Sequence, residues 1–325
     1  MVTASAAGKA ILFGEHAVVY GEPALAVAID ARVSVSLEPC DGDWKIDGYP
    51  LDSGRHPHVV YLRNAILGED SQPYSIHVNS ELFPAAGLGS SAALSSACSA
   101  AMLSTIGQPL DQEKIATLSH LAEAAAQSGR ASPTDTSTAT LGGCVFVSDK
   151  KEESSKWRYT RSLDTPEGER NWEVHSVSLP PSVSDLWIVV GYTGIHSPTG
   201  DMVAGLAELL AKHPEKMTDI SRMGEVARNG VDALSRGDFT LVGELMDEAH
   251  QLLAGVGVSC QELDVMVEVA RRSSLGAKMT GAGGGGCMLA LTTNPDETSA
   301  ALEMRGGRVL VTPFGAPSVR IENTP

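Results

Sequence analysis

Two segments of the chain combine glycine with small side chains and so leave backbone donors free. The first, Gly87-Leu88-Gly89-Ser90-Ser91, comes directly before a run of alanine and serine that we expect to form a buried helix. Backbone N–H groups and the helix dipole would converge at the start of this helix, where a phosphate can bind and a serine hydroxyl can help to hold Mg²⁺. A serine N-cap on a closely packed helix is the simpler alternative.

The second segment, "GAKMTGAGGGGCMLAL", places five glycines in six positions between two expected strands. This density favours tight turns and close approach of the backbone, although a glycine-rich hairpin turn is the alternative. No Walker lysine follows, so the ordinary P-loop is excluded. The five glycines are Gly281, Gly283, Gly284, Gly285 and Gly286.

The first segment also matches the pattern G-x-G-x-x-A of a dinucleotide site, through Gly87, Gly89 and Ala92, with Asp111 downstream. In that kind of site the acidic residue follows the second strand of a βαβ unit. Asp111 instead precedes an expected helix, so the βαβ unit is missing and a dinucleotide site is not favoured.

Five further side chains offer the chemistry of an active site, namely an ammonium, three carboxylates and an imidazole. A single lysine or histidine is more often a surface or packing residue than a catalytic one. These residues therefore gain significance only if the fold brings them together. They are Lys9, Glu15 and His16 near the N-terminus, with Glu123 and Asp135 in the middle of the chain.

The elements that must position these residues can be read from hydrophobic periodicity. Within residues 9–38, "KAILFGEH", "PALAVAID" and "RVSVSLEP" are short segments separated by glycine and proline, which is typical of separate strands joined by turns, and "YSIHVNSEL" alternates similarly. We expect one helix from Ser90 to about Ile106 and a second that begins at Asp111. The segment "SPTDTSTATLGGCVFV" predicts a loop that leads through two glycines into a strand.

The charged stretch 148–176 predicts a solvated hairpin or a long connector, and we place a domain boundary near its end, between residues 1–178 and 179–325. The second half begins with a strand at "DLWIVVGYT", continues with four helical patterns, and returns to strands at "GAKMT", "GCMLALTT" and "RVLVTPF". Helices and strands in both halves indicate an α+β fold.

Composition limits the classes of function. The 325 residues are 42% hydrophobic and 20% charged, which is ordinary for a globular protein. The net charge of −16 disfavours binding to nucleic acid or to an anionic membrane. The five cysteines form no C-x-x-C pair, and we expect them to be reduced core thiols. The N-terminal segment lacks the apolar region of a signal peptide and no run of 18 apolar residues occurs, so we expect a cytoplasmic protein.

Four segments together resemble the motifs of the GHMP kinase superfamily, named for galactokinase, homoserine kinase, mevalonate kinase and phosphomevalonate kinase. They are "GKAILFGEHAVVYGEPALAVAID", "GLGSSAA", "SPTDTSTATLGG" and "GAKMTGAGGGGC". The resemblance covers all three family motifs in order, from about residue 5 to residue 290. Residues 9–21 are most similar to the mevalonate kinases of the superfamily, because Ala17-Val18-Val19-Tyr20-Gly21 follows the Gly-Glu-His triplet. The "SPTD" form of the third segment resembles the archaeal members.

The resemblance implies two α+β domains with an active site in the cleft between them, and an ATP-dependent kinase that phosphorylates the C5 hydroxyl of mevalonate in isoprenoid biosynthesis. Asp135 would act on that hydroxyl as its base or orienting group. Lys9 would stabilise charge on the transferring phosphoryl group. Glu15 would hold Lys9, and His16 would hydrogen-bond the substrate.

The resemblance also assigns the nucleotide and the metal. The segment from Gly87 to Ala92 would wrap the ATP phosphates, while Gly281, Gly283 and Gly284 would help to shape the nucleotide pocket. Glu123 would bind Mg²⁺ together with the hydroxyl of Ser90 or Ser91, because Mg²⁺ prefers hard oxygen ligands.

Other functions remain as alternatives to this one. The same fold could serve another small-alcohol kinase, such as a sugar kinase or a mevalonate 3-kinase, or a non-catalytic sensor that binds a metabolite. A dehydrogenase is disfavoured by the missing βαβ unit. The substrate is a small molecule in each case, and the sequence leaves open whether the chain is a monomer or a homodimer.

Overall fold

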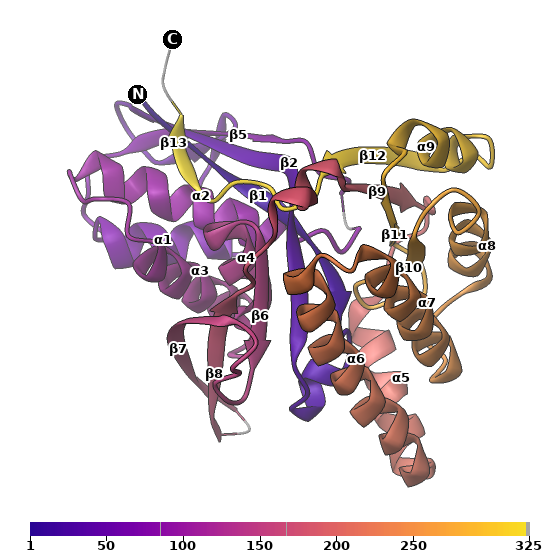
Figure 1. The fold of residues 1–325 in the computed structure, drawn as a ribbon. Helices are drawn as coiled ribbons and strands as arrows, with labels where there is room; N and C mark the ends of the chain where they lie inside the picture. Colours follow the sequence, from indigo (N-terminus) through magenta and orange to yellow (C-terminus); the bar gives the residue numbers. More distant parts are fainter. Residues whose placement is uncertain (85, 167, 323–325) are drawn as a thin grey trace.

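The computed structural model describes residues 1–84, 86–166 and 168–322, and within them two sheets organise the chain (Figure 1). The larger sheet has nine strands and the smaller has four. Helices and strands occur in both halves, so the α+β fold class predicted from the sequence is confirmed. All strand pairs except β3–β5 are antiparallel, and the described residues accordingly contain no βαβ unit of the dinucleotide-binding kind.

The nine-stranded sheet is built around β2. On one side β2 pairs with both β5 and β6, which continue the sheet in the order β4-β3-β5-β2-β6-β8-β7. On its other side β2 pairs with β1, which also pairs with β13. The strands are β1 (Val2–Phe13), β2 (Ala24–Pro39), β3 (Lys45–Ile46), β4 (Tyr49–Pro50), β5 (Tyr74–Ser80), β6 (Cys144–Ser148), β7 (Lys156–Thr165), β8 (Gly168–Ser176) and β13 (Arg320–Glu322).

The long strand β2 corrects one prediction, because "PALAVAID" and "RVSVSLEP" are a single strand and not two strands joined by a turn. Its pairing with β1 is irregular, since the register shifts between Ala7 and Gly8 and again between Ile11 and Phe13. Bulges of this kind bend a strand and re-aim the side chains beside them. Lys9 lies between the two irregularities.

Helices α1 (Pro57–Ile66), α2 (Ser90–Thr105), α3 (Gln112–Ala126) and α4 (Pro133–Leu141) belong to the same half of the chain as this sheet. The predicted helices at Ser90 and Asp111 are both confirmed, and the Asp111 carboxylate caps α3 by accepting from Lys114 N–H. Alanine, serine and cysteine fill α2, so the helix packs closely against β1, β2 and α3. Small side chains give up little rotamer entropy when they are buried.

Helix α4 corrects a second prediction, because "SPTDTSTATLGG" is helical over Pro133–Leu141 and not a loop. Ser132 accepts from Thr134 N–H, and Pro133 stands at the first helical position, which is a regular helix start. The threonines of this helix are buried. The stretch 148–176 forms the β7–β8 hairpin, which was one of its two predicted forms.

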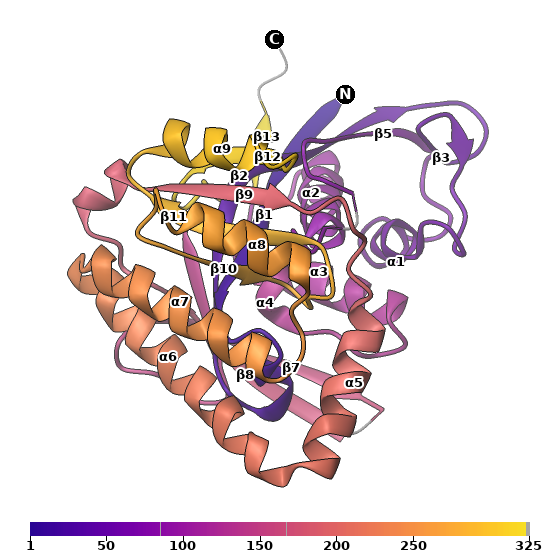
Figure 2. The ribbon, with the colours of Figure 1, turned by 90° about the vertical axis from the view of Figure 1, so that its right-hand side faces the viewer.

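The four-stranded sheet has the order β10-β11-β9-β12 (Figure 2). Helices α7 and α8 pack against β10, and α9 packs against β9 and β12. The strands and helical patterns predicted in this half are confirmed. Helix α9 in this half and helix α1 in the first half were not predicted. The elements are β9 (Trp187–Tyr192), β10 (Gly276–Thr280), β11 (Cys287–Thr292), β12 (Arg308–Pro313), α5 (Thr199–Lys212), α6 (Met217–Arg236), α7 (Phe239–Gly255), α8 (Gln261–Ala270), α9 (Pro295–Glu303), and the 3₁₀ turns η1 (Ala17–Tyr20), η2 (Pro181–Asp185) and η3 (Pro214–Lys216).

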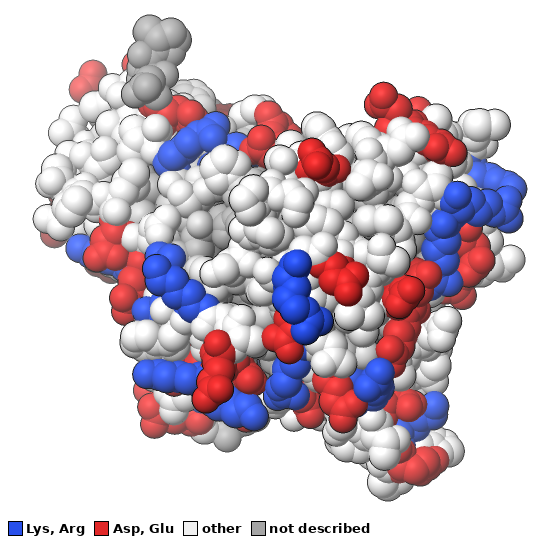
Figure 3. All heavy atoms as spheres, in the orientation of Figure 1, with Lys and Arg blue, Asp and Glu red and all other residues white. Residues whose placement is uncertain are grey.

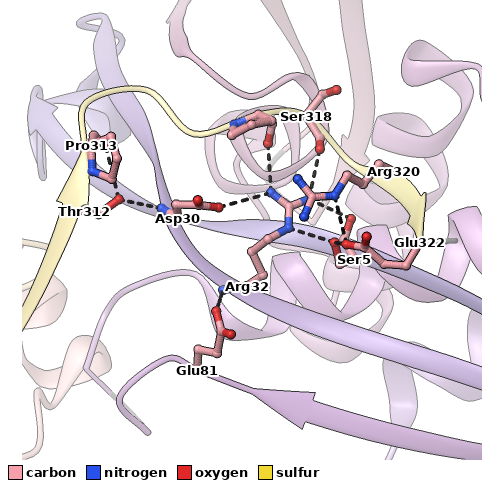
Figure 4. Close-up of polar contacts among 10 residues, drawn as sticks. Ser5, Asp30, Arg32, Glu81, Thr312, Pro313, Ser318, Arg320 and Glu322 are labelled. Atoms are coloured by element: carbon pink, nitrogen blue, oxygen red, sulfur yellow. Dashed lines mark hydrogen bonds and ion pairs between the residues drawn. The ribbon is translucent and has the colours of Figure 1, made fainter. Parts of the chain in front are cut away.

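A buried arginine fixes the last described strand to the first (Figure 4). The Arg32 guanidinium donates to the Ser5 hydroxyl and carbonyl and to the carbonyls of Pro317 and Ser318, at 2.7 to 3.0 Å. The Ser5 hydroxyl in turn donates to the Glu322 carboxylate. Four hydrogen bonds to one buried cation satisfy nearly all of its donors, which is what its burial requires.

The surface and the cysteines agree with a globular chain. On the face shown in Figure 3, positive and negative side chains are interspersed. All five cysteines are free. Cys98, Cys144 and Cys287 are buried as predicted, whereas Cys40 and Cys260 are only partly buried, and burial raises the pKa of the Cys98 and Cys287 thiols to about 12. In the described residues, no helix is both long and apolar enough to cross a membrane. We still propose a domain boundary between residues 1–178 and 179–325. Residues 323–325 lie outside the described residues, and β13 of the second part pairs with β1 in the first sheet.

Candidate active site

A cavity of about 430 Å³ collects most of the residues that the sequence singled out. Its walls come from β1, the loop before α2, α4, the first turns of α5 and the turn after β10. Ala92, Glu123, Gly283 and Gly284 do not line it. The predicted residues that do are Lys9, Glu15, His16, Gly87, Leu88, Gly89, Ser90, Ser91, Asp135 and Gly281.

The loop before α2 presents its backbone to the cavity. Gly87 and Gly89 have φ of 77° and 74°, in the left-handed region that glycine adopts without strain, and Gly89 is the N-cap of α2. Leu88 is buried, and its carbonyl accepts from Lys9 N–H at 2.9 Å, which ties the loop to β1. The first N–H groups of a helix have no acceptor within it, so the N-terminus of α2 offers donors and a positive dipole to an anion.

Lys9 and Asp135 meet in this cavity although 126 positions separate them in the sequence. Lys9 Nζ lies 3.2 Å from Asp135 Oδ2 and donates to the Gly87 carbonyl at 3.0 Å. The lysine side chain is 5% exposed and the aspartate 39%, so the cation is enclosed while the carboxylate faces the open space. Gly89 allows this arrangement, since a Cβ there would lie 2.7 Å from Lys9 Cγ.

The glycine-rich turn after β10 is packed so tightly that side chains would not fit. A Cβ on Gly283 would lie 1.8 Å from the Val258 carbonyl oxygen, and one on Gly284 would lie 2.8 Å from Met202 Sδ. Gly281 faces Gly87 instead, and a Cβ on either would approach the Cα of the other within 3.8 Å. The two glycine segments found in the sequence therefore lie side by side, with Gly281 at the cavity and Gly283 and Gly284 behind it.

The predicted contact between Glu15 and Lys9 is wrong. The Glu15 carboxylate pairs with the ammonium of Lys278 on β10, and both side chains are almost fully buried. Lys9 takes Asp135 as its partner instead. No local pattern distinguishes the two lysines as partners of Glu15, because Lys278 lies 263 positions from Glu15.

His16 follows Glu15 at the wall of the cavity. Its Nε2 lies 2.8 Å from the Ala282 carbonyl, to which Nε2–H donates. Burial lowers the pKa of His16, with the Ala282 hydrogen bond and the Glu15 charge opposing that effect, so the imidazole is neutral near pH 7. With Nε2 occupied, Nδ1 is the ring atom left to accept from a ligand.

The comparison with known proteins identifies the family. Residues 58–143 match the family "GHMP kinases N terminal domain", and residues 231–306 match the family "GHMP kinases C terminal". A mevalonate kinase of Pyrococcus furiosus is 34% identical over 99% of this chain and 98% of its own length. The chain belongs to the GHMP kinase family. A second relative of this GHMP kinase, the mevalonate kinase of Methanothermobacter thermautotrophicus, is 34% identical over 89% of each chain.

Solved structures agree with the fold of this GHMP kinase. A crystal structure of a mevalonate kinase matches it with a TM-score of 0.78 at 24% identity, covering 97% of this chain and 99% of the other. The mevalonate kinase of L. major in complex with R-mevalonate matches with a TM-score of 0.76 at 22% identity, over 97% and 95% of the two chains. The expected two-part α+β architecture of the family is therefore confirmed.

The candidate metal residues of this GHMP kinase lie where α3 meets the start of α2, with Ser90 and Ser91 at the cavity and Glu123 in contact with Ser91. Ser91 Oγ donates to Glu123 Oε2 at 3.1 Å, and Gln127 Nε2 donates to the same oxygen at 2.9 Å. Ser95 Oγ donates to Oε1 at 3.3 Å, and His58 Nε2 lies 3.3 Å from Oε1. Among the described contacts, the Glu123 carboxylate is therefore bonded to Ser91 and not to Ser90.

These donors fit Mg²⁺ bound together with phosphates. The described residues contain no group of three or more His, Cys, Asp or Glu that could hold a metal ion by themselves. Mg²⁺ keeps several waters and usually takes one or two carboxylates plus substrate phosphates, for which a serine hydroxyl and one glutamate beside the start of α2 are sufficient.

Sequence reasoning missed two residues of this GHMP kinase that join the sheets near the cavity. Lys278 is the buried partner of Glu15, and the Thr280 hydroxyl bonds both Ile11 N–H and Ile11 C=O. A lysine in the middle of an apolar strand is a detectable signal, because a buried ammonium requires a partner of opposite charge. The partner itself could not be read from the sequence.

Proposed function

We propose that this GHMP kinase is an ATP-dependent mevalonate kinase, which transfers the γ-phosphoryl group of ATP to the C5 hydroxyl of mevalonate. The observation that carries the proposal is the Lys9–Asp135 pair, 3.2 Å apart, in the cavity that the N-terminus of α2 faces. Support for mevalonate comes from relatives named mevalonate kinase that align over nearly the whole chain. Support also comes from the L. major structure, which holds R-mevalonate in the same fold.

The chain would bind the two substrates from opposite sides of the Lys9 ammonium. Free N–H groups at the start of α2 would hold the ATP phosphates, with the dipole of the helix favouring their negative charge. Lys9 stands between this loop and Asp135, because it bonds to Gly87 on one side and contacts the carboxylate on the other. A hydroxyl placed against Asp135 would therefore face the terminal phosphate.

Phosphoryl transfer in this site needs positioning and charge neutralisation more than covalent chemistry. The bond from the C5 oxygen to the γ-phosphorus forms as the bond from that phosphorus to the β–γ bridging oxygen breaks, and ADP leaves. Asp135 would orient the attacking hydroxyl and take its proton, while Lys9 would stabilise the charge on the transferred group. Mg²⁺, when bound by Ser91 and Glu123, would neutralise phosphate charge.

The proposal gives supporting roles to His16, to Glu15 and to the second glycine turn. His16 lines the cavity and bonds to Ala282 through Nε2, so its Nδ1 would accept from a substrate hydroxyl. Gly281 allows the turn to approach Gly87 and so to close the phosphate side of the cavity. We place the reaction in the cytoplasm, since ATP and mevalonate are charged, water-soluble metabolites.

A substrate panel tests the proposal. ADP release with Mg·ATP is measured against mevalonate, galactose, homoserine and phosphomevalonate, beside the variant Asp135→Asn and the surface control Asp296→Asn. Turnover with mevalonate alone, lost in Asp135→Asn and kept in the control, is the expected result. Turnover with another alcohol would retain a kinase and reject the substrate, and no turnover with any would favour a metabolite sensor.

Light scattering on the same samples distinguishes a monomer from a homodimer.

A further inference from the structure

Hydrogen bonds join the end of β1 to the end of β10 and so connect the two sheets at the cavity wall. The Thr280 hydroxyl accepts from Ile11 N–H at 3.0 Å and donates to Ile11 C=O at 3.1 Å, as a strand neighbour would. Two residues further along the chain, the Ala282 carbonyl accepts from His16. Thr280 and Ala282 flank Gly281, and Ile11 and His16 follow Lys9 in the chain. These contacts therefore lie close to cavity residues of both segments.

The Glu15–Lys278 pair is the most deeply buried contact of this junction. The side chains are 1% and 0% exposed, and Lys278 Nζ also donates to the Met279 carbonyl at 2.6 Å. Burial lowers the pKa of Lys278, and the Glu15 carboxylate opposes that effect. Replacing a buried ion pair by apolar residues of similar size is often neutral or stabilising, so stability alone does not account for a charged pair here.

The residue next to Glu15 has an unusual backbone. His16 has φ of 58° and ψ of −43°, a region that a residue with a Cβ adopts only when its surroundings hold it there. Two side-chain contacts help to hold it, the bond of its ring to Ala282 and the anchoring of the preceding Glu15 by Lys278, beside the backbone bond that its carbonyl accepts from Val19 N–H. Both anchors belong to the β10 strand and the turn that follows it.

We propose that Lys278 is a positioning residue for the kinase reaction, which by holding Glu15 fixes His16 and the 281–282 turn in the arrangement that accepts both substrates. Lys278 does not line the cavity, so it acts through Glu15 and not on a substrate. In this arrangement His16, at the cavity wall, binds the acceptor alcohol. The proposal rests on the proposed function of the site.

The test compares Lys278→Met with the double variant Glu15→Gln/Lys278→Met, and uses Lys45→Met as a control at an exposed lysine. Lys278→Met leaves a carboxylate buried without its cation, so we expect a lower melting temperature. The double variant removes both charges and should recover most of that temperature. If the pair positions His16, the double variant keeps a KM for mevalonate that is about tenfold or more above that of the wild type.

Hydrogen exchange of the substrate-free proteins supplies a second measurement. We expect faster exchange over residues 14–21 and 281–286 in the double variant, with unchanged exchange in α2 and β2. A double variant that recovers both the melting temperature and the KM would show that the pair is only structural and overturn the proposal. A raised KM with unchanged exchange would also overturn it, because Glu15 would then contact the substrate directly.

The two proposals can fail separately in this design. If the wild type does not turn over mevalonate, the proposed function fails, and the exchange comparison still decides whether Lys278 holds the Glu15–His16 segment. If the wild type is active and the exchange rates of these segments do not change, the kinase assignment stands and the positioning role is rejected.

Discussion

Replacing Lys9 by methionine removes one charge from the wall of the cavity and nearly preserves the length of the side chain. Lys9 Nζ contacts the Gly87 carbonyl at 3.0 Å and Asp135 at 3.2 Å. An ammonium carries three N–H donors, so the two described contacts leave one donor for the transferred phosphoryl group. Since that group gains contact with Lys9 chiefly during transfer, the variant should lose turnover more than nucleotide binding.

The size of the effect follows from these contacts. Losing one donor aimed at transition-state charge costs about 10²- to 10³-fold in kcat, or roughly 3 to 4 kcal/mol. The attraction between charges 3.2 Å apart is about 5 kcal/mol at an effective dielectric of 20. Asp135 is 39% exposed, however, so water replaces most of that attraction in the variant and the fold should persist.

The measurement combines steady-state kinetics with a fluorescence titration of an ATP analogue. We expect kcat of Lys9→Met to fall about 100- to 1000-fold, while the dissociation constant of the analogue changes by less than about threefold. Lys45→Met, at an exposed lysine, should match the wild type in both. A kcat that remains within about threefold of the wild type in a folded Lys9→Met protein would refute the charge-stabilising role.

Three further predictions concern the metal, the glycine turn and pH. Glu123→Gln should raise the Mg²⁺ concentration for half-maximal rate by about tenfold, because a carboxylate beside Ser91 is lost, and a Mg²⁺ titration that leaves this concentration unchanged would remove Glu123 from the metal site. Gly283→Ala should lower the free energy of unfolding by about 2 kcal/mol or more in a urea titration, since its Cβ would lie 1.8 Å from a carbonyl oxygen at φ of 85°. Gly255→Ala is its control, because its Cβ would enter open space in α7, and equal effects of the two would reject the packing argument. Burial lowers the pKa of His250 and of His120 to about 4, so the unfolded chain binds more protons between pH 6.5 and 4, and the free energy of unfolding should fall as pH falls through this window. A flat pH dependence there, or a slope unchanged by His250→Gln together with His120→Gln, would contradict it.

Much of the site could be predicted because its signals are local. The segment Gly87–Ser91 needs only its glycines and the helix that follows, and the structure shows both. The alternation of apolar residues located most strands, because a half-buried strand repeats every two residues. The missed helix α4 was also signalled locally, by Ser132 as N-cap and Pro133 at the first position, but its threonines have low helix propensity and tertiary burial prevailed over that propensity.

The rest depended on contacts between residues far apart in the chain. Lys9 has two carboxylates as possible partners in the sequence, Glu15 and Asp135, and it meets Asp135 because α4 packs against β1. Glu15 pairs with Lys278 because β10 runs beside the end of β1, an arrangement that no local pattern encodes. The prediction divided the single strand β2 between Asp30 and Arg32, which is where its register with β1 shifts, and strand pairing continues on both sides of that irregularity.

The pairing of β13 with β1 has a consequence for synthesis on the ribosome. β1, which carries Lys9, leaves the ribosome long before residues 320–322 and the carbonyls that Arg32 binds. Until they emerge, the edge of β1 at residues 3–5 stays unpaired and the Arg32 guanidinium lacks two of its acceptors. The nascent first half would thus expose an open strand edge, a known site of aggregation, and depend on chaperones until translation reaches β13.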